Sequence, residues 1–153
     1  MDKHSVLFVD DDPNILSGLK RVLRSQRKNW HLIFTDGGEK ALELMQQSEV
    51  DVIVSDMLMP GMNGCALFEK ISKQYPGVIR IMLSGQTSRT NVAKSILNSH
   101  LFLSKPCPIE YLINTLERVR KIKEILKSNK ANLRAVPRSF IPNQVRNIPV
   151  VNV

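Results

Sequence analysis

Short apolar runs rich in β-branched residues alternate with longer segments of helical periodicity along most of this 153-residue chain. The alternation is typical of βαβ units, in which successive strands lie parallel in one sheet and helices cover both of its faces. Five such units can be counted, which predicts an α/β fold with a doubly wound, five-stranded parallel sheet. The expected strands cover residues 5–9, 31–35, 51–55, 79–84 and 101–104.

Helices are expected between and after these strands. The first has a clear start, because Asp12 can cap free amide groups and Pro13 can occupy the first helical position, where its missing N–H costs nothing. The helix over residues 88–98 is the poorest in apolar residues and is expected to be the least firmly packed. The other helices are expected over residues 39–47, 64–74 and 109–126.

Length and charge distribution predict one domain and a tail. The net charge is +8, and five of the 22 lysine and arginine residues lie in residues 127–153, where there is no acidic residue. We therefore expect a domain over residues 1–127 that does not bind nucleic acid directly, and a basic linker or tail over residues 128–153 with proline and asparagine. Whether the chain is a complete protein or one piece of a longer regulator stays open.

Cysteine usage and hydropathy predict a cytoplasmic protein. The two cysteines, Cys65 and Cys107, have no metal-binding spacing, so we expect unpaired thiols in a reducing compartment. No apolar run approaches the ~20 residues needed to span a bilayer, so no membrane association is expected.

Polar side chains follow four of the five predicted strands. Asp10 and Asp11 follow the first strand, Asp56 the third, Ser84 ends the fourth, and Lys105 follows the fifth. Because the carboxyl ends of parallel strands meet at one edge of a sheet, we expect these side chains to gather there. Crowded carboxylates repel one another unless a hard cation lies among them, which indicates Mg²⁺.

This set of groups is suited to a phosphoryl group. Asp56 would be the nucleophile that attacks phosphorus, and Lys105 would hold a phosphoryl oxygen as a compact point charge. The Ser84 hydroxyl would donate a hydrogen bond only after the phosphoryl group is bound, which supplies a switch. Each aspartate also has a structural interpretation when it is considered alone. Asp12 is interpreted as a helix cap, and Asp11 could share that role. A single aspartate after a strand, such as Asp56, is usually a turn residue.

Four motifs in order carry a resemblance to a known family. They are residues 9–13 (VDDDP), 56–64 (DMLMPGMNG), 84–85 (SG) and 105–106 (KP). With these motifs at strand ends, residues 4–127 resemble the receiver domain of two-component response regulators. The resemblance implies a flavodoxin-like (βα)5 fold and a regulatory phosphoacceptor rather than an enzyme, with at most slow self-phosphorylation and autodephosphorylation.

The same resemblance implies roles for individual residues. Asp56 would accept the phosphoryl group from a histidine kinase or phosphotransfer protein. Asp10, Asp11, Asp56 and the backbone carbonyl of Leu58 would hold Mg²⁺. Ser84 and Phe102 would move together on phosphorylation. In the family, threonine is frequent at the position of Ser84 and tyrosine at the position of Phe102. The alternative interpretation of Phe102 is a core residue of the strand.

Phosphorylation would change the surface formed by residues 88–98, 101–104 and 109–126. That surface would control a partner protein or a fused output domain, and it could support a homodimer. The identities of kinase and output are left open, as is the phosphoryl lifetime, which Leu58 and Gln86 are expected to influence from beside the site.

Two other functions are compatible with part of this pattern. A haloacid-dehalogenase-like phosphatase also uses strand-end aspartates, a serine or threonine and a lysine, but it needs a later acidic metal-binding motif. After Lys105 the only acidic residues are Glu110, Glu117 and Glu124, on a predicted helix. A degenerate receiver that acts as a phosphate-independent binding module is disfavoured because all five site positions carry competent residues.

Overall fold

The computed structural model describes residues 3–85 and 97–128. Their five strands form one parallel sheet in the order β2-β1-β3-β4-β5, the flavodoxin-like order of a doubly wound α/β fold. The predicted fold class is confirmed. The strands are β1 (His4–Val9), β2 (Trp30–Thr35), β3 (Val52–Ser55), β4 (Ile79–Ser84) and β5 (Leu101–Ser104).

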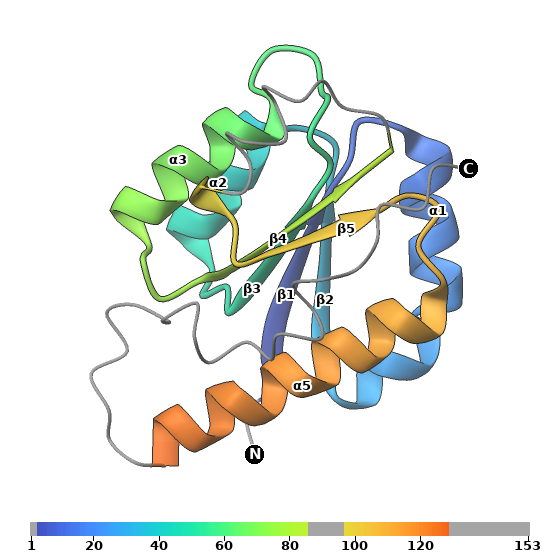
Figure 1. Ribbon diagram of the computed structural model, residues 1–153, viewed down its shortest axis with the longest axis vertical. Helices are drawn as coiled ribbons and strands as arrows, with labels where there is room; N and C mark the ends of the chain where they lie inside the picture. The colour runs from blue at the N-terminus through green and yellow to red at the C-terminus, as the bar shows by residue number, and fades with distance from the viewer. Residues whose placement is uncertain (1–2, 86–96, 129–153) are drawn as a thin grey trace.

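Helices cover both faces of the sheet. Figure 1 shows α2 and α3 on one face and α1 and α5 on the other. The helix predicted over residues 88–98 lies outside the described residues except for its last two positions, and so does nearly all of the predicted tail over 128–153. The described helices are α1 (Pro13–Val22), the 3-10 helix η1 (Arg24–Lys28), α2 (Gly38–Gln47), α3 (Gly64–Gln74) and α5 (Ile109–Ser128).

Apolar side chains from the sheet separate into two core clusters, one for each face. Val6, Phe8 and Val54 pack toward the layer of α1 and α5, and Leu7 and Ile53 pack toward α2 and α3. Every residue of β3 is buried, as expected for a central strand covered on both faces. Burying each of these side chains stabilises the fold by roughly 1.5–3 kcal/mol, which fixes the strands that carry the site.

Three of the five strand starts differ by one residue from the prediction, whereas β4 and β5 begin as predicted. β1 and β2 each begin one residue earlier, because His4 and Trp30 pair in the sheet and the Trp30 ring is buried. β3 begins one residue later. Asp51 only borders it, although its N–H donates to the Ser5 carbonyl over 3.0 Å.

Capping groups start two helices where the sequence indicates. The Asp12 carboxylate accepts the Asn14 N–H over 2.8 Å and Pro13 is the first residue of α1, so the predicted cap is confirmed. The Asn63 side chain accepts the Ala66 N–H over 2.8 Å at the start of α3. Within residues 3–85 and 97–128, no helix combines the length and the hydropathy that a membrane span requires.

Candidate functional site

Three carboxylates and one ammonium meet at the carboxyl edge of the sheet. Oxygen atoms of Asp10, Asp11 and Asp56 all lie within 4.8 Å of one another. The Lys105 Nζ lies 2.8 Å from Asp10 Oδ2 and 3.6 Å from Asp56 Oδ1. The structure therefore brings together the aspartates and the lysine that the strand-end pattern singled out.

Backbone contacts hold the two less exposed carboxylates in place. Asp10 is buried, and its Oδ1 accepts the Asp12 N–H over 2.9 Å. Asp56 Oδ1 accepts the N–H of Met57 over 2.9 Å, and the Asp56 N–H donates to the Val9 carbonyl over 2.9 Å. The last bond ties the end of β3 to the end of β1, so these carboxylates are fixed by the sheet itself. Asp11 is exposed and offers its carboxylate from the rim.

Lys105 reaches the carboxylates from the end of β5. Its N–H donates to the Ser84 carbonyl over 2.8 Å, which joins the carboxyl ends of β4 and β5. Ser84 is buried and pairs with Ser104 in the sheet. The serine, the lysine and the carboxylates thus belong to one edge of the sheet, as predicted.

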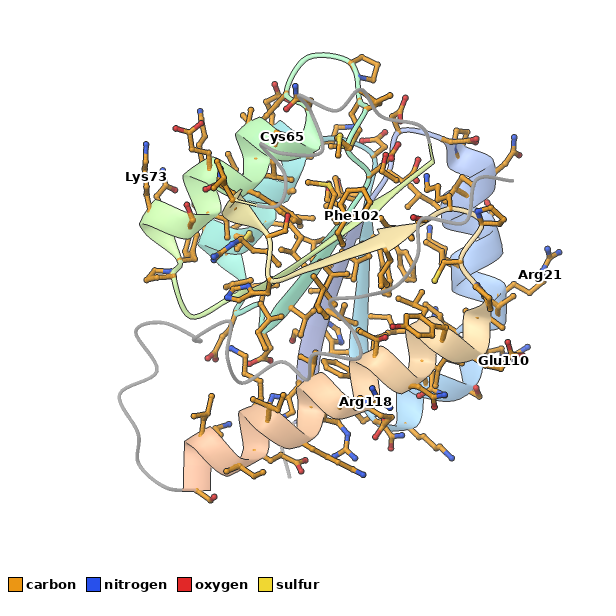
Figure 2. The ribbon with its side chains drawn as sticks, viewed as in Figure 1. Arg21, Cys65, Lys73, Phe102, Glu110 and Arg118 are labelled. Carbon is orange, nitrogen blue, oxygen red and sulfur yellow. The ribbon has the colours of Figure 1, made fainter. Side chains whose placement is uncertain are left out.

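Phe102 lies on β5, the edge strand of the sheet (Figure 2). It pairs with Met82 and is half-buried against the core cluster between the sheet and the layer of α2 and α3. This position agrees with either interpretation given to Phe102, so its movement with Ser84 stays a prediction. Leu58 lies in the loop after β3 with its side chain 53% exposed, and the role of its carbonyl also stays a prediction.

Two glycines shape the loop between Asp56 and α3. Gly61 has a φ of +72°, a conformation that side chains rarely adopt. A Cβ atom on Gly64 would lie 2.3 Å from the Asp56 carbonyl oxygen, and the Gly64 N–H donates to the Met57 carbonyl over 2.8 Å. The glycines at these two motif positions therefore let the loop fold back tightly against the residue that bears the candidate nucleophile.

Burial raises the pKa of the Asp56 carboxyl above its ordinary value, and the charges of Asp10 and Asp11 add to the effect. The Lys105 ammonium and the Met57 N–H oppose this rise without cancelling it. The negative charge on Asp56 is therefore undercompensated by the protein alone. A set of carboxylate oxygens with excess negative charge is the environment that a hard divalent cation such as Mg²⁺ prefers.

We expect Asp56→Asn to stabilise the protein at neutral pH in the absence of divalent cations. With a raised folded pKa, the protonated Asp56 favours folding; this contribution is present below the ordinary value of 3.8 and is lost as the pH rises through the folded pKa. Urea unfolding of both proteins should show the variant to be more stable at neutral pH, with the difference narrowing toward pH 3.8.

Asp36→Asn is the matched control for this measurement. Asp36 is exposed and pairs with Lys40 over 2.8 Å, and that lysine lowers its pKa. Its replacement should therefore not stabilise the protein. A wild-type protein as stable as Asp56→Asn at neutral pH would contradict the assignment of an undercompensated charge.

Comparison with known proteins decides the family. The model of the response regulator receiver domain matches residues 6–117. The chain belongs to the response regulator receiver family. The predicted resemblance is therefore confirmed, and the match favours a receiver domain of two-component signalling over a phosphatase. A degenerate receiver would match the same family, so phosphorylation of this chain stays a prediction.

Similar proteins include regulators from plants and bacteria. A two-component response regulator of Arabidopsis thaliana is 35% identical over 131 residues, which are 84% of this chain and 23% of that protein. The transcriptional regulatory protein GlrR of Escherichia coli is 31% identical over 113 residues, 73% of this chain and 25% of that protein. The solved signal receiver domain of an HD domain-containing protein from Pseudomonas fluorescens Pf-5 has a TM-score of 0.75 at 30% identity, covering 80% of this chain and 98% of that one.

This receiver chain spans about a quarter of the length of the two curated relatives. Sequence reasoning found its acidic cluster and lysine because strand-end residues can be read directly from the pattern. It missed the packing role of Gly64 and the burial of Lys123 on α5. The burial of Lys123 could have been predicted from helical spacing, because Lys123 follows Val119 by four residues and so lies on the buried face of that helix.

Proposed function

We propose that Asp56 is the phosphoacceptor of this receiver domain. One Asp56 oxygen would attack the phosphorus of a phosphohistidine on a kinase or phosphotransfer protein. A new O–P bond forms as the N–P bond breaks, and the histidine nitrogen leaves with the bonding electron pair. The observation that carries the proposal is the Lys105 ammonium, which lies within 4 Å of oxygen atoms of both Asp10 and Asp56.

Asp10, Asp11 and Asp56 would hold Mg²⁺, with the Leu58 carbonyl as a further proposed ligand. The cation supplies positive charge that offsets the crowded carboxylates and the phosphoryl oxygens. This assignment is supported by the carboxylate oxygen atoms that lie within 4.8 Å of one another and by the raised pKa of Asp56. Lys105 would bind a phosphoryl oxygen, and this interaction requires its ammonium to leave Asp10 in part.

Ser84 would report the phosphoryl group to the rest of the domain. Its hydroxyl would donate to a phosphoryl oxygen, and its carbonyl already accepts the Lys105 N–H. A shift of Ser84 would therefore reach β5, where Phe102 lies. We propose the surface of β5 and α5 as the contact with an output domain or effector protein, and as the surface of any phosphorylation-dependent homodimer. The helix predicted over residues 88–98, which lies largely outside the described residues, belongs to the same proposal.

The decisive experiment is labelling with acetyl phosphate in the presence of Mg²⁺. Intact-mass spectrometry should show one added phosphoryl group on the wild-type protein, and chelation of Mg²⁺ should prevent it. Asp56→Asn should abolish the label, whereas Asp36→Asn, which removes an exposed aspartate that follows β2 and pairs with Lys40, should keep it. Labelling of Asp56→Asn at the wild-type level would overturn the proposal.

The same preparation tests the proposed lack of enzymatic turnover. A receiver domain should hydrolyse a small phosphoester such as p-nitrophenyl phosphate negligibly, whereas a phosphatase would turn it over many times.

We also propose a cognate histidine kinase as the phosphoryl donor, an output domain as the target, and a cytoplasmic location. These proposals follow from the family, because the chain matches only part of the length of its relatives.

Leu58 is expected to influence how long the phosphoryl group persists. Its side chain is 53% exposed two residues after Asp56, where it can shield the phosphoryl group from water. Leu58→Asn replaces an apolar shield by a group that can hydrogen-bond and orient water, so the hydrolysis rate should change severalfold. Decay of the label after removal of acetyl phosphate gives the rate, and equal half-lives would refute the expectation.

A further inference from the structure

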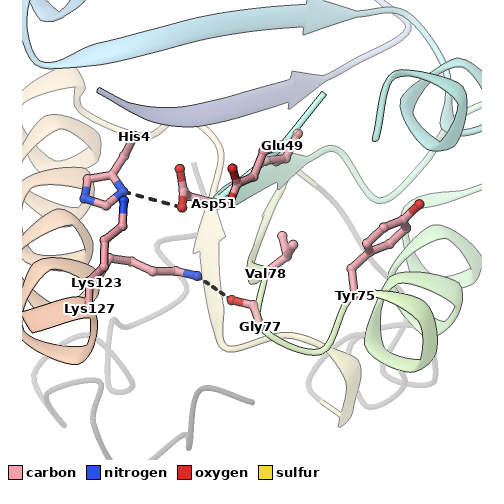
Figure 3. Close-up of a pocket in the computed structure, with 9 residues that line it drawn as sticks. His4, Glu49, Asp51, Tyr75, Gly77, Val78, Lys123 and Lys127 are labelled. Atoms are coloured by element: carbon pink, nitrogen blue, oxygen red, sulfur yellow. Dashed lines mark hydrogen bonds and ion pairs between the residues drawn. The ribbon is translucent and has the colours of Figure 1, made fainter. Parts of the chain in front are cut away.

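A pocket opens at the amino ends of the strands, at the edge opposite the one that carries Asp56 (Figure 3). Its volume is about 250 Å³, just below the roughly 300–1,000 Å³ typical of small-molecule sites, which suits a ligand of few atoms. Its walls are His4 of β1, residues 49–51 before β3, Tyr75, Gly77 and Val78 before β4, and Lys123 and Lys127 near the end of α5.

Lys123 places an ammonium in this pocket although the residue is only 6% exposed. Its Nζ donates to the Gly77 carbonyl, which is its only hydrogen-bond partner within the described part of the chain (Figure 3). An ammonium has three donors, so two N–H groups are available. Burial lowers the pKa of Lys123, and the nearby charges of Asp51 and Glu49 oppose that shift only in part.

Neither acidic neighbour is a dedicated counterion for Lys123. Asp51 Oδ2 accepts the Ser5 N–H over 2.7 Å, and Asp51 Oδ1 lies 3.4 Å from His4 Nδ1. Asp51 is thus engaged with β1. Glu49 is exposed and forms no ion pair with a residue in ranges 3–85 or 97–128. A buried cation with open donors and no paired anion is unfavourable, and an anionic ligand would relieve it.

We propose that this pocket binds a small monocarboxylate, whose oxygen atoms accept hydrogen bonds from Lys123 while Lys127 contributes positive charge at the mouth. The two lysines lie on α5, whereas the two acids lie before β3. A ligand with one carboxylate can therefore place its charge beside the lysines and its uncharged end toward the acids. A second negative charge would face Asp51 and Glu49, so dicarboxylates and phosphate dianions should bind more weakly.

Titration of ¹⁵N-labelled protein with acetate, lactate or pyruvate tests the proposal. At least one of them should cause saturable shifts in the amide signals of Gly77, Val78 and Asp51, with a dissociation constant in the millimolar range or tighter. The indole signal of Trp30 should report the same event, because this sole tryptophan lies 6.1 Å from the His4 ring, centroid to centroid. Succinate and phosphate should bind more weakly, and chloride serves as the ionic-strength control.

Three variants distinguish specific binding in the pocket from a general attraction of anions to the lysines of α5. Lys123→Met keeps the length of the side chain and should raise the dissociation constant at least tenfold. Lys127→Gln should raise it severalfold without altering the core, so it provides the test if Lys123→Met does not fold. Lys121→Gln removes an exposed lysine of α5 that does not line the pocket and should change nothing.

Several outcomes would overturn the proposal. One is the absence of saturable shifts with every monocarboxylate, and another is unchanged binding in both pocket variants. A loss of affinity in Lys121→Gln as large as in the pocket variants would also contradict it. So would tighter binding of succinate or phosphate than of monocarboxylates. Labelling of Asp56 is measured separately on the same samples, and its result does not bear on this site.

Discussion

Lys105→Met is expected to slow phosphorylation by acetyl phosphate by about two to three orders of magnitude, the cost typical of removing one preorganised group that stabilises developing charge. The Lys105 Nζ lies 3.6 Å from Asp56 Oδ1, so it can reach an oxygen of a phosphoryl group bound there. Methionine keeps the length and packing of the side chain but carries no charge. The rate of label incorporation, measured by intact mass at saturating Mg²⁺, gives the result directly.

Lys105→Arg is the matched control for this variant. It keeps the positive charge but replaces a compact ammonium by a larger planar fork with a different arrangement of donors. We expect it to recover only part of the rate. Phosphorylation of Lys105→Met within threefold of the wild-type rate would contradict the role assigned to the ammonium.

Lys105→Met also leaves Asp10 without its ion-pair partner. Removing one member of a buried pair usually costs about 3–5 kcal/mol, although the 24% exposure of the Lys105 side chain reduces that cost here. Mg²⁺ should restore part of the stability, because it brings positive charge to the same carboxylates. Circular dichroism with and without Mg²⁺ therefore shows whether a slow variant is folded when its labelling is measured.

The phosphoryl site could be predicted from sequence because its residues follow strands whose direction is fixed by the fold. In a parallel sheet, Asp10 after β1, Asp56 after β3 and Lys105 after β5 must emerge at one edge. The strand order, which places β1 beside β3, then brings Asp10 and Asp56 together. The bond from the Asp56 N–H to the Val9 carbonyl shows how closely the backbone enforces that meeting.

The opposite edge could not be predicted in the same way. Its pocket depends on Lys123, and a lysine on a long helix is usually solvated, so a charge count places it at the surface. Its burial arises because α5 covers one face of the sheet and its last turns reach the amino ends of the strands (Figure 1). The predicted starts of β1 and β2 were one residue late for a related reason: His4 and Trp30 pair in the sheet through backbone bonds, which hydropathy does not encode.

The two edges of the sheet carry undercompensated charges of opposite sign. At the carboxyl edge, Asp56 is an undercompensated anion, and at the amino edge Lys123 is an undercompensated cation. Both belong to elements held by the same core, so relief of either charge stabilises the same folded state. A cation at the first edge and a carboxylate at the second should therefore each raise the unfolding midpoint.

Gly64→Ala is expected to destabilise the domain by about 3 kcal/mol, the upper part of the range for overpacking a tight site. An added Cβ would lie 2.3 Å from the Asp56 carbonyl oxygen and 3.0 Å from Met57 Cα. Both neighbours are backbone atoms, so no side chain can rotate away to make room. Alanine would otherwise favour the first turn of α3, which makes a loss of stability diagnostic of the contact.

Gly18→Ala supplies the control, because Gly18 lies within α1 and a Cβ there has no heavy atom within 4 Å. That variant should gain about 0.5–1 kcal/mol from reduced freedom of the unfolded chain. Urea unfolding of the two variants should thus give opposite signs. Because the Gly64 contact presses on the backbone of Asp56, the same variant should also lose acetyl phosphate labelling at temperatures where it is still folded. Equal stability of Gly64→Ala and wild type would show that the loop after β3 can open without cost, and that the glycine does not position the phosphoacceptor.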